Sequence, residues 1–136
     1  MTGTYVLVIE VTEATTIEVG ALGDRNFTPG TYAYVGSAFG PGGFARIDRH
    51  RELAAGDRET RHWHVDYLLG DPAARLETAI TFPDADRECE LAGSLPGTPV
   101  PDFGASNCDC GSHLLAVSTD DSVLDAAVDT GGIVDG

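Results

Sequence analysis

The sequence contains no lysine. All eight basic residues are arginines, and they stand against 22 aspartates and glutamates, which leaves a formal net charge of −14 on 136 residues. Such a charge causes strong self-repulsion in dilute buffer, whereas molar salt screens it because the Debye length falls to about 3 Å. The absence of lysine together with the acidic excess is typical of a halophile's protein. The alternative is an ordinary acidic protein.

The sequence also lacks a long apolar run and a recognisable leader. No stretch approaches the roughly 20 apolar residues that span a membrane. The first residues, "MTGTYVLVIEV", carry no basic region and no small-residue cleavage site, so they predict a first strand rather than a signal peptide. We therefore expect a cytoplasmic protein with no membrane attachment. Its length, with 42% hydrophobic residues, suits one compact domain over residues 1–136.

The few basic residues are unevenly placed. Residues 43–64 hold five of the eight arginines and four acids, so this segment carries a net charge of +1 and the remainder −15. Three of the four histidines lie in the same segment. A cation-rich segment within an anionic protein is a candidate anion-binding site. The alternative is a helix whose surface charges are paired.

Apolar periodicity and turn residues predict the order of the elements. Strands are expected at residues 4–11, 15–22, 31–38, 74–82 and 113–118, the last being the final strand of the chain. Helices are expected at residues 44–56, 62–70, 84–95 and 120–132, and loops at residues 23–30 and 96–104. This mixture predicts an α+β fold, with a small, mainly antiparallel sheet flanked by helices.

Two short motifs lie in predicted strands, "GTY" at residues 3–5 and "YVG" at residues 34–36. Ser37 follows the second motif, and the next predicted helix carries Arg46 and His50, which are four residues apart and therefore share a helix face. Further along come "HWHVDYLL", "REC" and "CDCGSHLL". In this order the set resembles the GIY-YIG endonuclease superfamily, and within it the small stand-alone Uri-type endonucleases. The resemblance covers nearly the whole chain.

The resemblance implies a divalent-metal-dependent endonuclease, a hydrolase that cleaves phosphodiester bonds in DNA for repair or structure-selective cleavage. Breaking that bond requires an activated water, neutralisation of charge at phosphorus and help for the leaving oxygen. By the resemblance, Tyr5 and Tyr34 lie on neighbouring strands of one sheet with converging hydroxyls, and they hold or deprotonate the water. Arg46 grips a phosphate oxygen. His50 assists proton transfer or binds the phosphate, and Glu88 holds one Mg²⁺ or Mn²⁺ ion.

Each of these assignments has an alternative. Glu90 competes with Glu88 as the metal ligand, and Glu88 could instead interact with the N-terminal dipole of its helix. Arg49 could replace Arg46, although it lacks the four-residue spacing to the histidine. The tyrosines could be ordinary core residues of their strands, and Arg46 could pair with Glu52.

The cysteines and one histidine form a second candidate site. "CDCGSH" brings Cys108, Cys110 and His113 together in the sequence, and Cys89 lies on the helix predicted at residues 84–95. Three thiolates and one imidazole can make a tetrahedral structural Zn²⁺ site, and a reducing cytosol disfavours disulfides. The alternative is that the cysteines are small buried apolar groups.

Three classes of function follow from the sequence. A DNA endonuclease leads, and the alternatives are a catalytically inactive nucleic-acid-binding module and a zinc-stabilised interaction protein on the same scaffold. The 136 residues hold no basic tail and no additional DNA-binding domain. We therefore expect DNA as a partner without sequence-specific cutting, and a protein partner that supplies targeting.

The acidic composition predicts that salt stabilises the fold. Because screening relieves the self-repulsion of the −14 charge, we expect the melting temperature to rise from dilute buffer to molar potassium chloride, with partial unfolding in dilute buffer. Circular-dichroism melts across a salt series measure this. Highest stability at low salt would contradict the halophile interpretation.

Overall fold

The computed structural model describes residues 3–18, 23–38, 43–54, 64–71, 73–84, 98–99, 114–117, 120–129 and 131–135. Along the chain its elements are β1 (Gly3–Val11), β2 (Thr15–Glu18), β3 (Asp24–Phe27), β4 (Gly30–Ala38), α1 (Ala45–Ala54), α2 (His64–Leu69), β5 (Ala74–Pro83), β6 (Thr98–Pro99), β7 (Leu114–Val117), α4 (Asp120–Asp129) and β8 (Ile133–Asp135).

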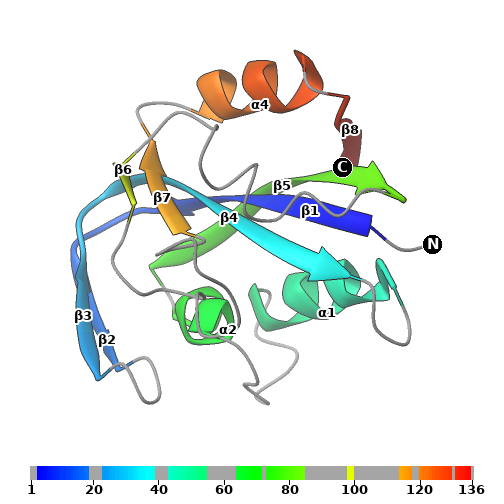
Figure 1. Cartoon of the computed structure of the whole chain (residues 1–136). Helices are drawn as coiled ribbons and strands as arrows, with labels where there is room; N and C mark the ends of the chain where they lie inside the picture. Colours follow the sequence, from blue (N-terminus) through cyan, green and yellow to red (C-terminus); the bar gives the residue numbers. More distant parts are fainter. Residues whose placement is uncertain are drawn as a thin grey trace.

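The main sheet has six strands in the order β6-β7-β4-β1-β5-β8, and all its neighbouring strands are antiparallel. Helices α1 and α2 lie on one side of this sheet and α4 lies on the other, as Figure 1 shows. We call these two sides the α1 face and the α4 face. The predicted α+β fold, with a mainly antiparallel sheet flanked by helices, is confirmed.

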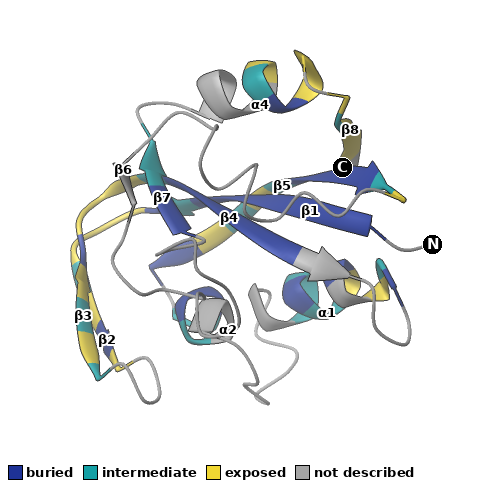
Figure 2. Cartoon of the chain, in the orientation of Figure 1, coloured by how far each residue is buried: buried dark blue, intermediate teal, exposed yellow. Residues whose placement is uncertain are grey.

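Strand β1 is the centre of the core because it is buried on both faces (Figure 2). Its run of β-branched and aromatic residues is typical of a strand covered on both sides. On the α1 face, the core includes Tyr5, Leu7, Ile9, Tyr32, Tyr34, Ile47 and Leu68. On the α4 face, it includes Val6, Val8, Ala33, Val35, Ile80, Phe82 and Ala127.

Strands β2 and β3 form a separate two-stranded sheet. The prediction of a loop over residues 23–30 is therefore wrong, because Asp24–Phe27 pairs with Thr15–Glu18. The apolar pattern of the sequence did not indicate strand β3, because β3 contains one buried apolar residue, Phe27, and three charged or polar residues. Its partner β2 is the preceding strand, but β3 itself lacks the alternation of apolar and polar residues that indicates a half-buried strand.

The C-terminal part of the chain also differs from the prediction. Helix α4 ends at Asp129, and the amides of Gly131 and Gly132 donate to the carbonyls of Val128 at 3.1 Å and Ala127 at 2.9 Å. These two bonds form a Schellman motif, and Gly131 has the positive φ of 103° that this motif requires. The reversal allows the chain to add β8, so the strand at 114–117 is not the last one.

Another strand lies in the predicted loop over residues 96–104. Thr98–Pro99 forms β6 and pairs with β7 at the end of the sheet. Proline is tolerated there because an edge strand needs ladder hydrogen bonds on one side only.

Among the helices that the structure describes, none has the length and apolar character needed to cross a membrane.

Gly132 is required where α4 meets the sheet. A Cβ at this position would lie 2.6 Å from Ile80 Cγ2 and 2.8 Å from the Ala127 carbonyl oxygen. We expect Gly132→Ala to lower the free energy of unfolding by about 1–3 kcal/mol, because overpacking forces neighbours to shift. Urea denaturation measures the loss, with the exposed Val128→Ala as the matched control. Equal stability of the two variants would show that the junction tolerates a methyl group.

Candidate active site

Tyr5 and Tyr34 lie on adjacent strands of one sheet. In the β1–β4 register Tyr5 is opposite Gly36 and Leu7 is opposite Tyr34, so the two tyrosines are diagonal neighbours. Both belong to the core cluster on the α1 face, together with Tyr32. The prediction that the paired tyrosines share one face of neighbouring strands is confirmed. Convergence of the Tyr5 and Tyr34 hydroxyls stays a prediction.

Gly36 provides the space for the Tyr5 side chain. A Cβ at residue 36 would overlap the ring and the hydroxyl oxygen of Tyr5. The Tyr5 ring therefore lies over the backbone of the opposite strand at a point where only glycine fits. The signal for this role was the antiparallel pairing of "GTY" with "YVG", which places the tyrosine of one motif opposite the glycine of the other.

His50 joins this pair from helix α1. Its Nε2 is 2.8 Å from the Tyr5 hydroxyl, although the two residues are 45 positions apart in sequence. The ring centroids are 5.6 Å apart with an interplanar angle of 43°, so the rings are tilted rather than stacked. Tyr5 is 1% exposed, His50 is fully buried and Tyr34 is 6% exposed. The hydrogen bond thus lies inside the protein, with Tyr34 slightly nearer the surface.

The packing of α1 explains why His50 reaches Tyr5. Ile47 is 1% exposed and belongs to the core of the α1 face, so it holds this side of the helix against the sheet. His50 follows three residues later and therefore lies on the same side of the helix. Arg46 is one turn before His50 on the helix, and its side chain lies outside the described atoms.

Two other arginines of α1 have different environments. Arg49 is half-buried and its Nη1 is enclosed. Arg51 is a surface residue whose Nη1 lies 3.5 Å from Asp48 Oδ1. An exposed pair of this kind contributes little to stability. The paired-charge interpretation of this segment therefore applies to Arg51.

Tyr32 has a structural role. Its hydroxyl donates to the backbone carbonyl of Thr28 at 2.9 Å, and its ring meets Phe27 edge-on at a centroid distance of 5.7 Å. These contacts join β4 to the end of β3, so Tyr32 is not assigned to the candidate site.

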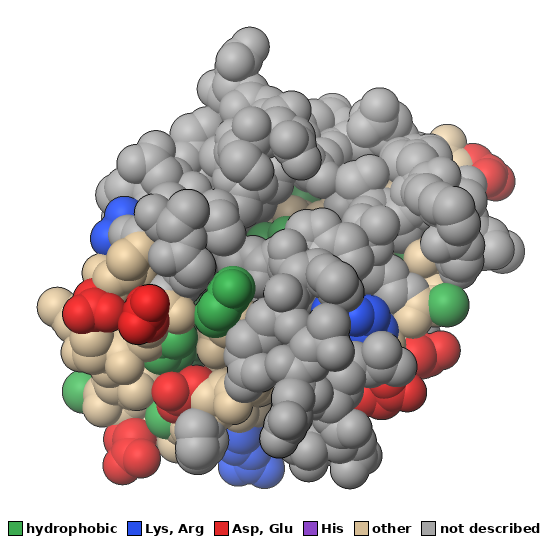
Figure 3. All heavy atoms as spheres, turned by 90° about the horizontal axis from the view of Figure 1, so that it is seen from below, with side chains coloured by type: hydrophobic (Ala, Val, Ile, Leu, Met, Phe, Trp, Pro, Cys, Tyr) green, Lys and Arg blue, Asp and Glu red, His purple; other side chains and the backbone are tan. Residues whose placement is uncertain are grey.

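The charge on the α1 face is mixed. Figure 3 views the molecule from this side, where both acidic and arginine side chains of the described residues reach the surface.

Several predicted site residues lie outside the described residues, namely Glu88, Cys89, Glu90, Cys108, Cys110 and His113. Within the described residues, no three histidine, cysteine, aspartate or glutamate side chains come together as a metal-binding group. Asp84, expected to begin the helix at 84–95, has a φ of 59° and lies in a turn, which is not the extended conformation of a helix N-cap.

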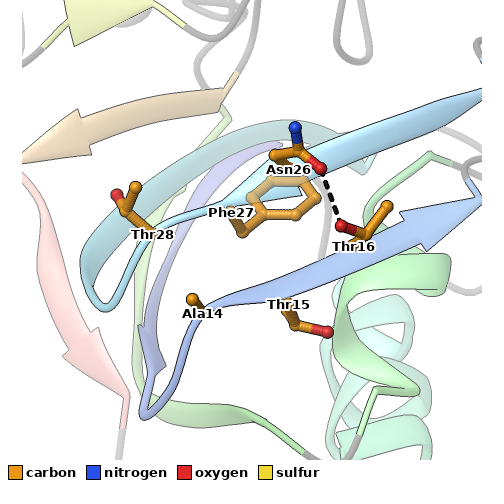
Figure 4. A pocket seen from close by; sticks show the side chains of 6 residues that line it. All are labelled: Ala14, Thr15, Thr16, Asn26, Phe27 and Thr28. Atoms are coloured by element: carbon orange, nitrogen blue, oxygen red, sulfur yellow. Dashed lines mark hydrogen bonds between the residues drawn. The ribbon is translucent and has the colours of Figure 1, made fainter.

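A surface hollow of about 260 Å³ lies beside the β2–β3 hairpin (Figure 4). Three threonines, Asn26, Ala14 and the aromatic Phe27 line it, and Thr16 Oγ1 lies 2.7 Å from Asn26 Oδ1 across the hairpin. The lining contains no ionisable side chain and shares no residue with the site around Tyr5. It does not provide the groups needed for acid–base or phosphate chemistry.

The contact between Tyr5 and Gly36 can be tested by a double-mutant cycle. We expect Gly36→Ala to cost about 1–3 kcal/mol of unfolding free energy, because the added methyl group collides with the Tyr5 ring. In a Tyr5→Val background the same change should cost much less, since the ring atoms are gone. Denaturant melts of the four proteins give the coupling. An equal cost in both backgrounds would mean that the methyl group clashes elsewhere.

Comparison with known proteins gives one positive result. No curated protein and no solved structure matches the chain. The family model described as the domain of unknown function DUF123 matches residues 4–133, which include β1, β4, α1 and the other described elements up to the start of β8. The chain therefore belongs to the DUF123 family.

Proposed function

We propose that this protein is a divalent-metal-dependent endonuclease of the GIY-YIG type that hydrolyses phosphodiester bonds in DNA. The observation that carries the proposal is the 2.8 Å hydrogen bond between the Tyr5 hydroxyl and His50 Nε2. Both residues were selected from separate motifs, and a chance pair of motifs would not be expected to meet in the fold. The pairing of "GTY" and "YVG" on adjacent strands supports the same assignment.

The Tyr5–His50 pair suits proton transfer. A neutral imidazole with an unprotonated Nε2 accepts a hydrogen bond from the phenol, and it can accept the proton itself when Tyr5 takes one from the attacking water. Tyr34 lies diagonally beside Tyr5 on the same face and is the more exposed of the two, so it is the better placed to hold that water.

Arg46 supplies the positive charge in this proposal. It is one helical turn from His50, within residues 43–64, which carry a net charge of +1. A guanidinium grips phosphate oxygens through two parallel hydrogen bonds and stabilises the charge that develops during cleavage. Arg49, half-buried on the same helix, is the alternative for this role.

Glu88 is the proposed holder of the metal, with Glu90 as the alternative. When bound, a divalent cation neutralises charge on the phosphate and assists the leaving oxygen. Zinc bound by Cys89, Cys108, Cys110 and His113 remains a separate structural proposal. It would stabilise the part of the chain that carries Glu88 without taking part in the reaction.

The burial of the pair favours a second candidate function. Tyr5 is 1% exposed and His50 is fully buried, which is also what a structural hydrogen bond in a core requires. The same scaffold would then bind nucleic acid without cutting it. Both candidate functions require the protein to bind nucleic acid, but only the endonuclease cleaves it.

The deciding experiment offers the protein branched, nicked and single-stranded DNA, with and without magnesium, in molar potassium chloride. Metal-dependent cleavage of any of the three supports the nuclease and indicates its preferred substrate. Binding without cleavage under all conditions supports the inactive module.

Two variants test the proposed residues. We expect Arg46→Ala to reduce the cleavage rate ~100- to 1,000-fold, the usual cost of removing one preorganised contact to developing charge, with the melting temperature nearly unchanged. Tyr5→Phe should also reduce cleavage, because it removes the hydroxyl that faces His50. Single-turnover rates and thermal melts of each variant provide the measurements.

The matched control is Arg51→Ala, which removes the same charge from the same helix at a residue paired on the surface with Asp48. It should cleave at close to the unmodified rate. If Arg46→Ala unfolds while its folded fraction retains full activity, Arg46 is structural.

A further inference from the structure

The C-terminal part of the described structure exposes a small apolar surface. Val128 is 49% exposed, Ile133 is 57% exposed and Val134 is 49% exposed. Among the described residues these three are the large hydrophobic side chains that are exposed to solvent. They belong to the last turn of α4 and to β8, which contact each other, and we call them together the β8 surface.

The β8 surface coincides with the end of the main sheet. Strand β8 pairs with β5 on one side and is the last strand in the sheet order. Backbone N–H and C=O groups on the outer side of such a strand can pair with a further extended chain. The β8 surface therefore combines apolar side chains with an edge suited to strand addition, which is a recurrent way of binding peptides.

Among the described side chains of α4 and β8, the charged ones are negative. Residues 120–135 contain five aspartates and no arginine. Asp125 and Asp129 are exposed, and the last turn of α4 has no basic residue. Asp129 ends the helix, where the dipole is negative and a cation is favoured. A basic side chain of a bound protein would interact favourably with the negative end of the helix dipole and with the carboxylates of these aspartates.

We propose that the β8 surface binds an extended, arginine- or lysine-rich segment of another protein, which adds to the sheet as a strand beside β8. In the β5–β8 register Val134 is opposite Ile80 on the α4 face, and Ile133 is opposite Thr81 on the other face. Apolar side chains of the segment therefore contact Ile133, and its cations, on the alternate face, lie beside Val134 near Asp125 and Asp129. A second copy of this chain fits less well, because a symmetric contact would bring the same aspartates together. The partner is recognised by charge complementarity combined with strand pairing.

The β8 surface is separated from Tyr5 by strand β5. Tyr5 is opposite Thr81, and Thr81 is opposite Ile133, so a strand added beyond β8 has both β5 and β8 between it and Tyr5. Helix α4, which contacts β8, lies on the opposite side of the sheet from α1 (Figure 1). The proposal does not depend on the nuclease activity, because its test measures binding of a peptide.

The experiment uses a fluorescent seven-residue peptide that alternates arginine with valine. Its control carries proline in place of the central valine, which keeps the charge but removes a ladder donor and disfavours the paired strand. Binding is followed by anisotropy at the lowest salt at which the protein is folded, and amide chemical shifts locate the site. We expect the alternating peptide to bind at least about tenfold more tightly than the proline control, with shifts centred on residues 133–135.

Matched protein variants complete the test. Ile133→Ser combined with Val134→Ser should weaken binding at least about tenfold, as expected for apolar residues at the centre of a contact. Asp129→Asn should weaken it more than Glu18→Gln, which removes the same charge from an exposed residue of the β2–β3 hairpin. Equal binding of both peptides, or equal effects of the two charge variants, would reduce the interaction to non-specific attraction and overturn the proposal. Self-association lost in the double serine variant would assign the surface to a second copy and would also overturn it.

Discussion

The arrangement of Tyr5 over Gly36 is the constraint on which the candidate site depends. The tyrosine ring occupies the volume that a side chain on the opposite strand would need, and its hydroxyl then reaches His50. A shift of the β1–β4 register by one residue would turn Tyr5 to the other face of the sheet. The long pairing from Gly3–Ala38 to Val11–Gly30 holds the register. The geometry of the proposed catalytic pair is thus fixed by an extended set of ordinary strand contacts.

The sequence predicted the parts of the fold whose signals are local. Strands β1 and β4 have continuous apolar and aromatic runs, and α1 combines apolar spacing with glycines at its start. The motifs also selected Tyr5, Tyr34 and His50 as site residues. In the structure the two tyrosines lie on the α1 face of the sheet, and His50 contacts Tyr5 from helix α1. By contrast, β3 is short and mostly polar, and β8 is short and exposed and pairs with β5, which lies far back along the chain. The double glycine after α4 was available as a signal, since "GG" after an amphipathic helix is typical of a Schellman ending. The role of Gly36 required the register, which periodicity alone does not provide.

The two sides of the sheet differ in the charge of the segments that cover them. The α1 face receives its helix from the part of the chain with a net charge of +1, whereas α4 contributes four aspartates and no arginine. Helix α1 therefore repels an anion less than α4 does. In molar salt these long-range effects weaken, so contacts at hydrogen-bond distance must carry more of the recognition.

The central position of β1 also affects how the protein folds while it is being synthesised. This first strand is apolar towards both helical layers, and its partners β4 and β5 emerge from the ribosome later, with β5 separated by about 70 residues. Until β5 has been made, one edge of β1 and part of its apolar surface have no native neighbour in the main sheet. A nascent chain of this topology is therefore exposed to misassociation for most of its translation, and chaperones that shield N-terminal strands would act during that interval.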